Sequence, residues 1–173
     1  MFTRPATPED SLAAAEVVRL VYEEFGFTWD PDDYHADLHD LAGSYLDAGH
    51  GFWVAEIPGR GVIGTAALEI FPPIAGAPGL PTEHGGITRI GGTDCSLERL
   101  YVIPDARGGA GTALMREVVD EARRRGRKRM EIWSDKRFEA AHRLYGRFGA
   151  RPVGERVCSD PDQSPEWGLV IDL

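Results

Sequence analysis

The stretch LERLYVIPDARGGAGTALMREV, residues 97–118, predicts a strand, a glycine-rich turn and a helix in immediate succession. Residues 97–103 form the strand, and Pro104 stops it because proline has no backbone N–H to donate to a ladder. Glycines in residues 107–111 let a ligand approach the backbone, and the helix that follows leaves its first N–H groups unbonded. Arg107 adds a forked cation suited to phosphate. The stretch therefore predicts an anion site at the turn, although glycine-rich turns between a strand and a helix also occur without any ligand.

The rest of the chain supplies the other elements of one α/β domain, in the order β-α-α-β-β-β-α-β-α-β-β. A length of 173 residues suits one domain. Toward the N-terminus we predict a strand at 2–4, a helix from Thr7 to Gly26, a second helix from Asp30 to Gly43 or Gly49, and a hairpin of 52–57 with 62–71. Toward the C-terminus we predict a helix ending at Gly126, a strand at 130–133, a helix at 138–148, and strands at 153–158 and 167–173.

Residues 72–93 differ in kind, because proline and glycine are frequent there. Neither a regular helix nor a central strand suits that composition. We interpret the segment as an insertion within the domain, since the pieces on either side are too small to fold alone. A loop of this length is often functional.

Composition narrows the class of protein further. The net charge of −9 argues against wholesale nucleic-acid binding, and no apolar run has the length of a membrane span. The first ten residues lack the apolar core of a signal peptide. Cys95 and Cys158 are the two cysteines, 63 residues apart, so we expect no zinc site, no disulfide framework and a cytoplasmic location.

The charge is divided unevenly along the chain. Residues 1–98 carry 4 basic and 16 acidic side chains (net −12), and residues 99–173 carry 15 basic and 12 acidic ones (net +3), which together give −9. One half favours a cationic ligand and the other an anionic one, although two differently solvated surfaces would give the same pattern.

Two nucleotide-binding motifs fail at the glycine-rich turn. A phosphate-binding P-loop needs a lysine followed by serine or threonine at the helix start, and Gly111-Thr112 lacks the lysine. A dinucleotide fingerprint needs a third glycine after Gly109 and Gly111, and Leu114 stands there.

The arrangement resembles the GNAT superfamily of acetyl-CoA-dependent N-acetyltransferases. The opening, residues 4–10, resembles the family's first strand and helix start. Residues 100–114 resemble its pyrophosphate loop, although the loop is one residue short. Residues 141–149, AHRLYGRFG, resemble its late A-x-x-x-Y-x-K/R-x-G helix, but Phe138 replaces the asparagine of many relatives.

This resemblance implies a mostly antiparallel mixed sheet flanked by helices, with a parallel pair formed by 97–103 and 130–133. It implies acetyl-CoA as co-substrate, an amine as acceptor and no metal, and it leaves a homodimer open. Its cofactor-binding positions fall on Leu100, Tyr101, Val102, Arg107, Gly108, Gly109, Ala110, Gly111, Thr112, Phe138 and Arg147.

The resemblance also suggests the catalytic groups. Tyr145 matches the tyrosine that protonates the leaving thiolate, with packing in the core as the alternative role. Glu98 is our candidate for the base that deprotonates the amine, with an ion pair as the alternative. Other candidate bases are Glu69, Asp94, His84 and Asp135.

The predicted function is transfer of an acetyl group from acetyl-CoA to a primary amine of a small molecule or peptide, by direct attack in a ternary complex. A CoA-binding regulatory module of the same fold without catalysis is the alternative. A nucleotide-binding protein with a degenerate loop is a third hypothesis.

Overall fold

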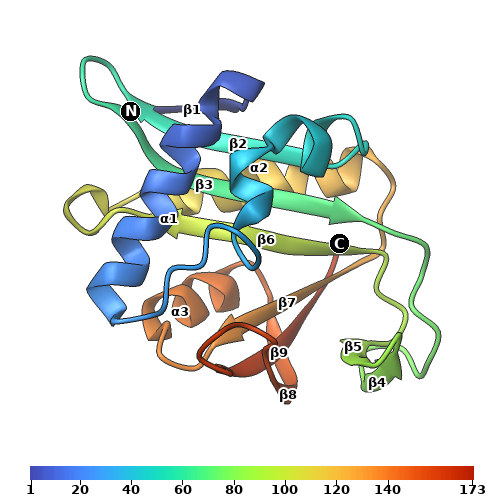
Figure 1. The fold of residues 1–173 in the computed structure, drawn as a ribbon. Helices are drawn as coiled ribbons and strands as arrows, with labels where there is room; N and C mark the ends of the chain where they lie inside the picture. The colour runs from blue at the N-terminus through green and yellow to red at the C-terminus, as the bar shows by residue number, and fades with distance from the viewer. The chain divides into compact units, whose positions relative to one another are not determined.

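The computed structural model describes residues 1–173 (Figure 1). The chain divides into two compact units. The first comprises residues 1–69 and 98–121, and the second comprises residues 70–97 and 122–173. The boundaries fall inside strand β6 (Cys95–Val102) and inside helix α2 (Ala110–Arg124), so each unit contains a part of both elements. The strand order is β1-β2-β3-β6 in the first unit and β6-β7-β9-β8 in the second.

The first unit is an antiparallel sheet with a helix that has clear end signals. Its strands β1 (Phe2–Pro5), β2 (Gly51–Ile57) and β3 (Gly61–Ile70) pair in sequence order. A single 3-10 turn, η1 (Pro8–Asp10), leads into helix α1 (Ser11–Phe25). The helix ends at Gly26, whose φ of 70° is the left-handed conformation that glycine adopts most easily.

Helices pack on both faces of this sheet. Phe52, Val54 and Ala67 are buried in one cluster with the apolar face of α1. On the other face Leu114 of α2 lies over Gly64, where an added Cβ would come within 3.0 Å of its Cδ1 atom. Figure 1 shows α1 in front of β3 and α2 behind it.

The second predicted helix is not an α-helix. Residues 31–35 form turns, followed by a 3-10 helix η2 (Ala36–His39) and a π-helix η3 (Ala42–Leu46). Side chains compete here for the backbone: Asp30 accepts the N–H of Asp33 at 3.3 Å, and Asp40 accepts that of Gly43 at 2.9 Å. Such local bonds offer the chain an alternative to the regular ladder of helical hydrogen bonds.

The second unit contains the parallel pair that the sequence predicts. Residues 95–97 of β6 pair in parallel with β7 (Arg129–Asp135), while β9 (Pro165–Asp172) pairs antiparallel with both β7 and β8 (Arg151–Val157). Helix α3 (Glu139–Arg147) connects β7 to β8. The predicted fold class, a mixed α/β sheet flanked by helices, is confirmed.

Part of segment 72–93 is a hairpin of β4 (Pro81–His84) and β5 (Ile87–Ile90). Its two-residue turn is Gly85-Gly86, with φ values of 61° and 83°, as a tight hairpin requires. The buried carboxylate of Glu131 on β7 holds the base of the hairpin, because it accepts the N–H of Ile90 at 2.8 Å and pairs with Arg89. None of the helices is both long and apolar enough to cross a membrane.

Candidate active site

The predicted anion site lies in the first unit, where β6 leads into α2. A 3-10 turn η4 (Pro104–Ala106) follows the strand, Arg107 is extended, and Gly108 and Gly109 have φ values of 120° and 124°. A side chain at either glycine would be strained by that backbone, although a Cβ there would meet no atom within 4 Å. The glycines thus provide both the sharp entry to the helix and open space above it.

The start of α2 provides hydrogen-bond donors. The carbonyl of Gly109 accepts the N–H of Ala113 at 2.9 Å, which makes Gly109 the last residue before the helix. The N–H groups of Ala110, Gly111 and Thr112 have no carbonyl partner within the helix, because the residue four positions earlier lies before the helix begins. These donors and the positive end of the helix dipole favour a negatively charged group such as a phosphate.

Arg107 is held by a partner that the sequence does not indicate. Its Nη1 atom lies 2.7 Å from Oε1 of Glu24, its Nη2 atom also contacts that carboxylate, and its Nε atom lies 3.4 Å from the carbonyl oxygen of Val102. The two charged side chains are 43% and 32% exposed. The cation therefore stands at the surface in an ion pair that solvent reaches.

Strand β6 changes direction just before its last three residues. Arg99 has a φ of 50°, which is uncommon for a residue with a side chain, and its carbonyl accepts the hydroxyl of Thr65 at 2.7 Å. The residues that follow, Leu100, Tyr101 and Val102, are half-buried.

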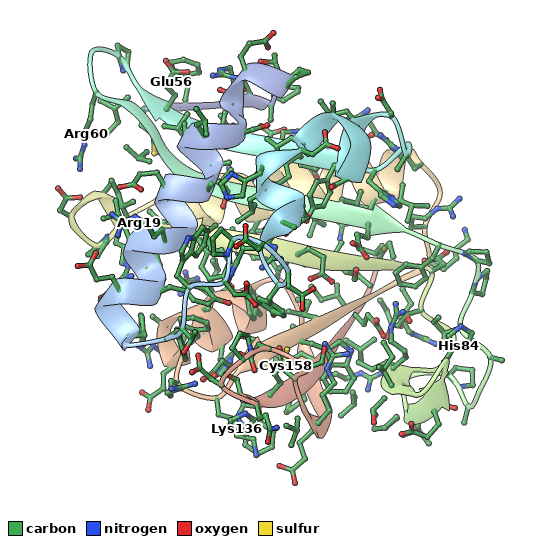
Figure 2. All side chains as sticks on the ribbon, viewed as in Figure 1. Arg19, Glu56, Arg60, His84, Lys136 and Cys158 are labelled. Atoms are coloured by element: carbon green, nitrogen blue, oxygen red, sulfur yellow. The ribbon has the colours of Figure 1, made fainter.

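The candidate bases have different environments. Glu98 on β6 and Glu69 on β3 are half-buried, whereas His84 is exposed on the β4–β5 hairpin (Figure 2). The carboxylate of Asp94 accepts the N–H groups of residues 128 and 129, at 3.0–3.2 Å. Burial alone would raise the pKa of Asp135, but hydrogen bonds from Arg137 outweigh it and hold that pKa below its usual value. Both aspartates therefore act as structural acceptors.

The second unit holds the remaining predicted residues, on and beside α3. Tyr145 is buried, with its ring centroid 6.4 Å from that of His142, whose Nε2 atom lies 3.1 Å from the hydroxyl of Ser134. Phe138 is half-buried at the start of α3, where its carbonyl accepts the N–H groups of Ala141 and His142. Arg147 is exposed in the last turn.

The first unit also contains an arginine–aspartate pair, Arg99–Asp37, that the sequence does not indicate. Arg99 binds the carboxylate of Asp37 through Nε at 2.9 Å and Nη2 at 2.7 Å, and Tyr45 donates its hydroxyl to the same carboxylate. The only signal in the sequence is a charged residue inside a strand and an aspartate-rich segment far from it.

Fold and loop together define a class of protein: a mixed α/β sheet with a central strand that enters a glycine-rich anion site at a helix start. Comparisons with known proteins specify the family. The model of the acetyltransferase (GNAT) family matches residues 14–150. An uncharacterized N-acetyltransferase of Escherichia coli, YjgM, is 30% identical over 152 residues, covering 84% of this chain and 79% of that protein.

A further curated protein and a solved structure are also similar to this chain. N-acetyltransferase 8 of Rattus norvegicus is 34% identical over 124 residues, covering 70% of this chain and 49% of that protein. Among solved structures, yncA of Salmonella typhimurium, a putative acetyltransferase solved with its cofactor acetyl-CoA, has a TM-score of 0.71 at 20% identity and covers 99% of this chain and 92% of that one. The chain belongs to the acetyltransferase (GNAT) family, and the prediction of an acyltransferase is confirmed.

Proposed function

We propose that the protein is an N-acetyltransferase that moves an acetyl group from acetyl-CoA to a primary amine of a small molecule or peptide, by direct attack in a ternary complex. The observation that carries the proposal is the junction of β6 and α2, where open glycines expose the donors of a helix start beside an exposed arginine. Phosphates are the groups that such a junction binds best.

The residues at this junction suit the phosphates of CoA. The N–H groups of Gly109, Ala110, Gly111 and Thr112 would bind the pyrophosphate, and Gly108 keeps the approach open. Arg107 would exchange its contact with Glu24 for a phosphate oxygen. The bound acetyl-CoA seen in the Salmonella protein supports the choice of this co-substrate.

Acetyl-CoA supplies a thioester, and the protein has to provide a neutral amine and a stabilised carbonyl oxygen. An amine with a pKa of about 10.4 is neutral for only ~10^-3.4 of the time at pH 7, which costs roughly 4.6 kcal/mol. We assign the base to Glu98, directly or through a water. Backbone N–H groups of Leu100, Tyr101 and Val102 would hold the pantetheine arm and the thioester carbonyl.

The second unit contributes a proton donor in this proposal. Tyr145 would protonate the departing thiolate, and Phe138 and Arg147 would contact the cofactor from the start and end of α3. These assignments rest on the match of residues 141–149 to the family motif. We further propose a cytoplasmic location, since Cys95 and Cys158 are both free thiols.

We also propose that residues 72–93 are an insertion of a single domain and border the acceptor. Shared elements support one domain, because a cut between the units would divide both β6 and α2. The Arg89–Glu131 pair anchors the insertion within the second unit.

Release of free CoA with a panel of primary amines tests catalysis directly. Turnover with at least one amine supports the proposal; thermal stabilisation by acetyl-CoA without turnover would favour the regulatory module instead. Stabilisation by ATP or NAD and not by acetyl-CoA would favour the nucleotide-binding hypothesis. Arg107→Glu should weaken the stabilisation by acetyl-CoA more than Arg125→Glu, and equal losses would indicate general electrostatics.

A further inference from the structure

Arg99 combines an unfavourable backbone conformation with a buried charge. Its φ of 50° lies in the left-handed region, where residues other than glycine are strained. Its side chain is only 13% exposed, so the guanidinium has also lost most of its hydration. Arginine at this position is therefore unfavourable for folding unless its side chain makes specific contacts.

Those contacts all lead to one segment of the first unit, residues 34–45. The guanidinium binds both carboxylate oxygens of Asp37, at 2.7 and 2.9 Å, and donates to the carbonyl of Tyr34 at 2.7 Å. It also lies 5.1 Å from the ring centre of Tyr34. Because Tyr45 donates to the same carboxylate, Asp37 links the arginine to the far end of the segment.

The segment has little regular structure: Leu38, Leu41 and Tyr45 pack it into the apolar core of the first unit, and the Arg99–Asp37 pair adds a charged anchor. The segment contains only a 3-10 helix of four residues and a π-helix of five, and such short elements are not stable alone. Its anchor is attached to β6 one residue before the backbone of Leu100, Tyr101 and Val102. The left-handed turn at Arg99 thus couples residues 34–45 to the strand end.

The charge of the segment indicates which substrate it would meet. The segment with its flanks, residues 27–47, contains six aspartates and neither lysine nor arginine. Asp37 is paired with Arg99, and the other five would repel the phosphates of CoA and attract a protonated amine. Half-buried rings of Trp29 and Tyr34 pack beside His35, at 4.2 and 4.8 Å between centroids, and give this acidic segment an apolar surface.

We propose that Arg99 is a positioning residue that holds residues 34–45, through Asp37, as the wall that receives the amine acceptor. This inference rests on the proposed acetyl transfer, in which the segment Leu100–Val102 holds the thioester. Arg99 touches neither substrate; it acts through the segment that it anchors.

Steady-state kinetics with an amine that the parent acetylates test the proposal. Arg99→Lys keeps the positive charge but loses the contact through two nitrogen atoms. Asp37→Asn removes the negative charge of the partner. Arg99→Gly relieves the backbone strain and removes the anchor. The matched control is Arg4→Lys, because Arg4 binds Asp10 through two bonds of 2.7 and 2.8 Å elsewhere in the same unit.

We expect all three variants to raise the KM of the amine by about 10-fold or more, with kcat and the KM of acetyl-CoA changed by less than about 3-fold. Arg4→Lys should leave all three constants unchanged within about 2-fold. A rise in the KM of acetyl-CoA as large as that of the amine, or an amine KM unchanged in Arg99→Gly and Asp37→Asn, would overturn the proposal.

Hydrogen exchange provides a readout that needs no turnover. Amides in residues 36–46 should exchange at least about 10-fold faster in Arg99→Lys and Asp37→Asn than in Arg4→Lys, while those of α2 remain protected. Unchanged exchange would contradict the anchoring role. A parent protein that acetylates no amine would refute the proposed function, and the exchange experiment would still decide whether Arg99 anchors the segment.

Discussion

His35 is expected to make the stability of the protein depend on pH between about 4 and 6.5. Its imidazole is fully buried, with its ring stacked on Trp29 at 4.2 Å and its Nε2 atom without a hydrogen-bond partner. Burial, assisted by the positive charge of Arg99, lowers the pKa of His35 from 6.5 to about 4. The folded protein therefore keeps this side chain neutral at pH values where the unfolded chain binds a proton.

The sign and the size of the effect follow from that difference. Above pH 6.5 His35 is neutral in both the folded and the unfolded state, so proton binding takes nothing from the free energy of unfolding. As the pH falls from 6.5 toward 4 only the unfolded chain binds the proton, and the free energy of unfolding decreases. A difference of about 2.5 pKa units corresponds to about 3 kcal/mol of unfolding free energy, at 1.36 kcal/mol for each unit.

His35→Phe isolates this contribution. Phenylalanine keeps a ring against Trp29 but loses the Nδ1 atom, which lies 3.2 Å from the N–H of Asp30, so the variant should be less stable than the parent by at most about 1 kcal/mol at pH 7. Its free energy of unfolding should fall less on acidification, and the two curves should cross between pH 6.5 and 4.

Urea unfolding followed by tryptophan fluorescence at several pH values between 4 and 8 measures both curves. Carboxylates remote from His35 titrate alike in parent and variant, so the difference between the curves reports on His35 together with the adjacent Asp30 and Asp37. His84→Gln, at an exposed position on the β4–β5 hairpin, controls for removal of an imidazole as such. Parallel curves for the parent and His35→Phe would refute the reasoning.

Three further predictions concern the proposed reaction. Glu24→Gln should tighten acetyl-CoA binding by about 1.4- to 5-fold, because an exposed ion pair worth about 0.2–1 kcal/mol no longer competes for Arg107; calorimetry measures this, and unchanged affinity would mean that Arg107 does not contact phosphate. Tyr145→Phe should unfold within about 1 kcal/mol of the parent but transfer acetyl groups about 10^2-fold more slowly; a parent-like rate, with chemistry shown to be rate-limiting, would leave the tyrosine a packing role. The rate defect of Glu98→Gln should shrink as pH rises, since the amine then deprotonates unaided; a defect of constant size between pH 7 and 10 would exclude Glu98 as the base.

The predictable part of this structure is local in sequence. The strand of residues 97–103, the stop at Pro104 and the glycine-rich entry to α2 each depend on neighbours within a few positions, and the structure has them as predicted. The parallel pairing of β6 with β7 also follows from element order, because a helix connects the two strands.

The differences arise where side chains compete with regular structure. Aspartates after Pro31 indicate a helix start, but those of residues 30 and 40 bind nearby N–H groups and break the segment into short turns. The Gly85-Gly86 pair is a hairpin signal that the general proline and glycine content of residues 72–93 conceals.

Ion pairs between distant residues cannot be predicted from spacing at all. Arg99 and Asp37 are 62 positions apart, and Arg107 and Glu24 are 83 apart. In both pairs the acidic residue lies within residues 1–98. Arginines of β6 and of the loop after it therefore neutralise part of the excess negative charge of residues 1–98.

These two pairs should nevertheless behave differently, because their burial differs. The Arg107–Glu24 pair is exposed on both sides, so water screens it and an incoming phosphate can replace the carboxylate at little cost. The Arg99–Asp37 pair is largely buried, and separating it would leave an uncompensated charge in a poorly hydrated site. One contact is thus suited to exchange with a ligand, whereas the other is suited to permanent support. That contrast is why we expect Glu24→Gln to change only the affinity for acetyl-CoA and Asp37→Asn to change chiefly the use of the amine.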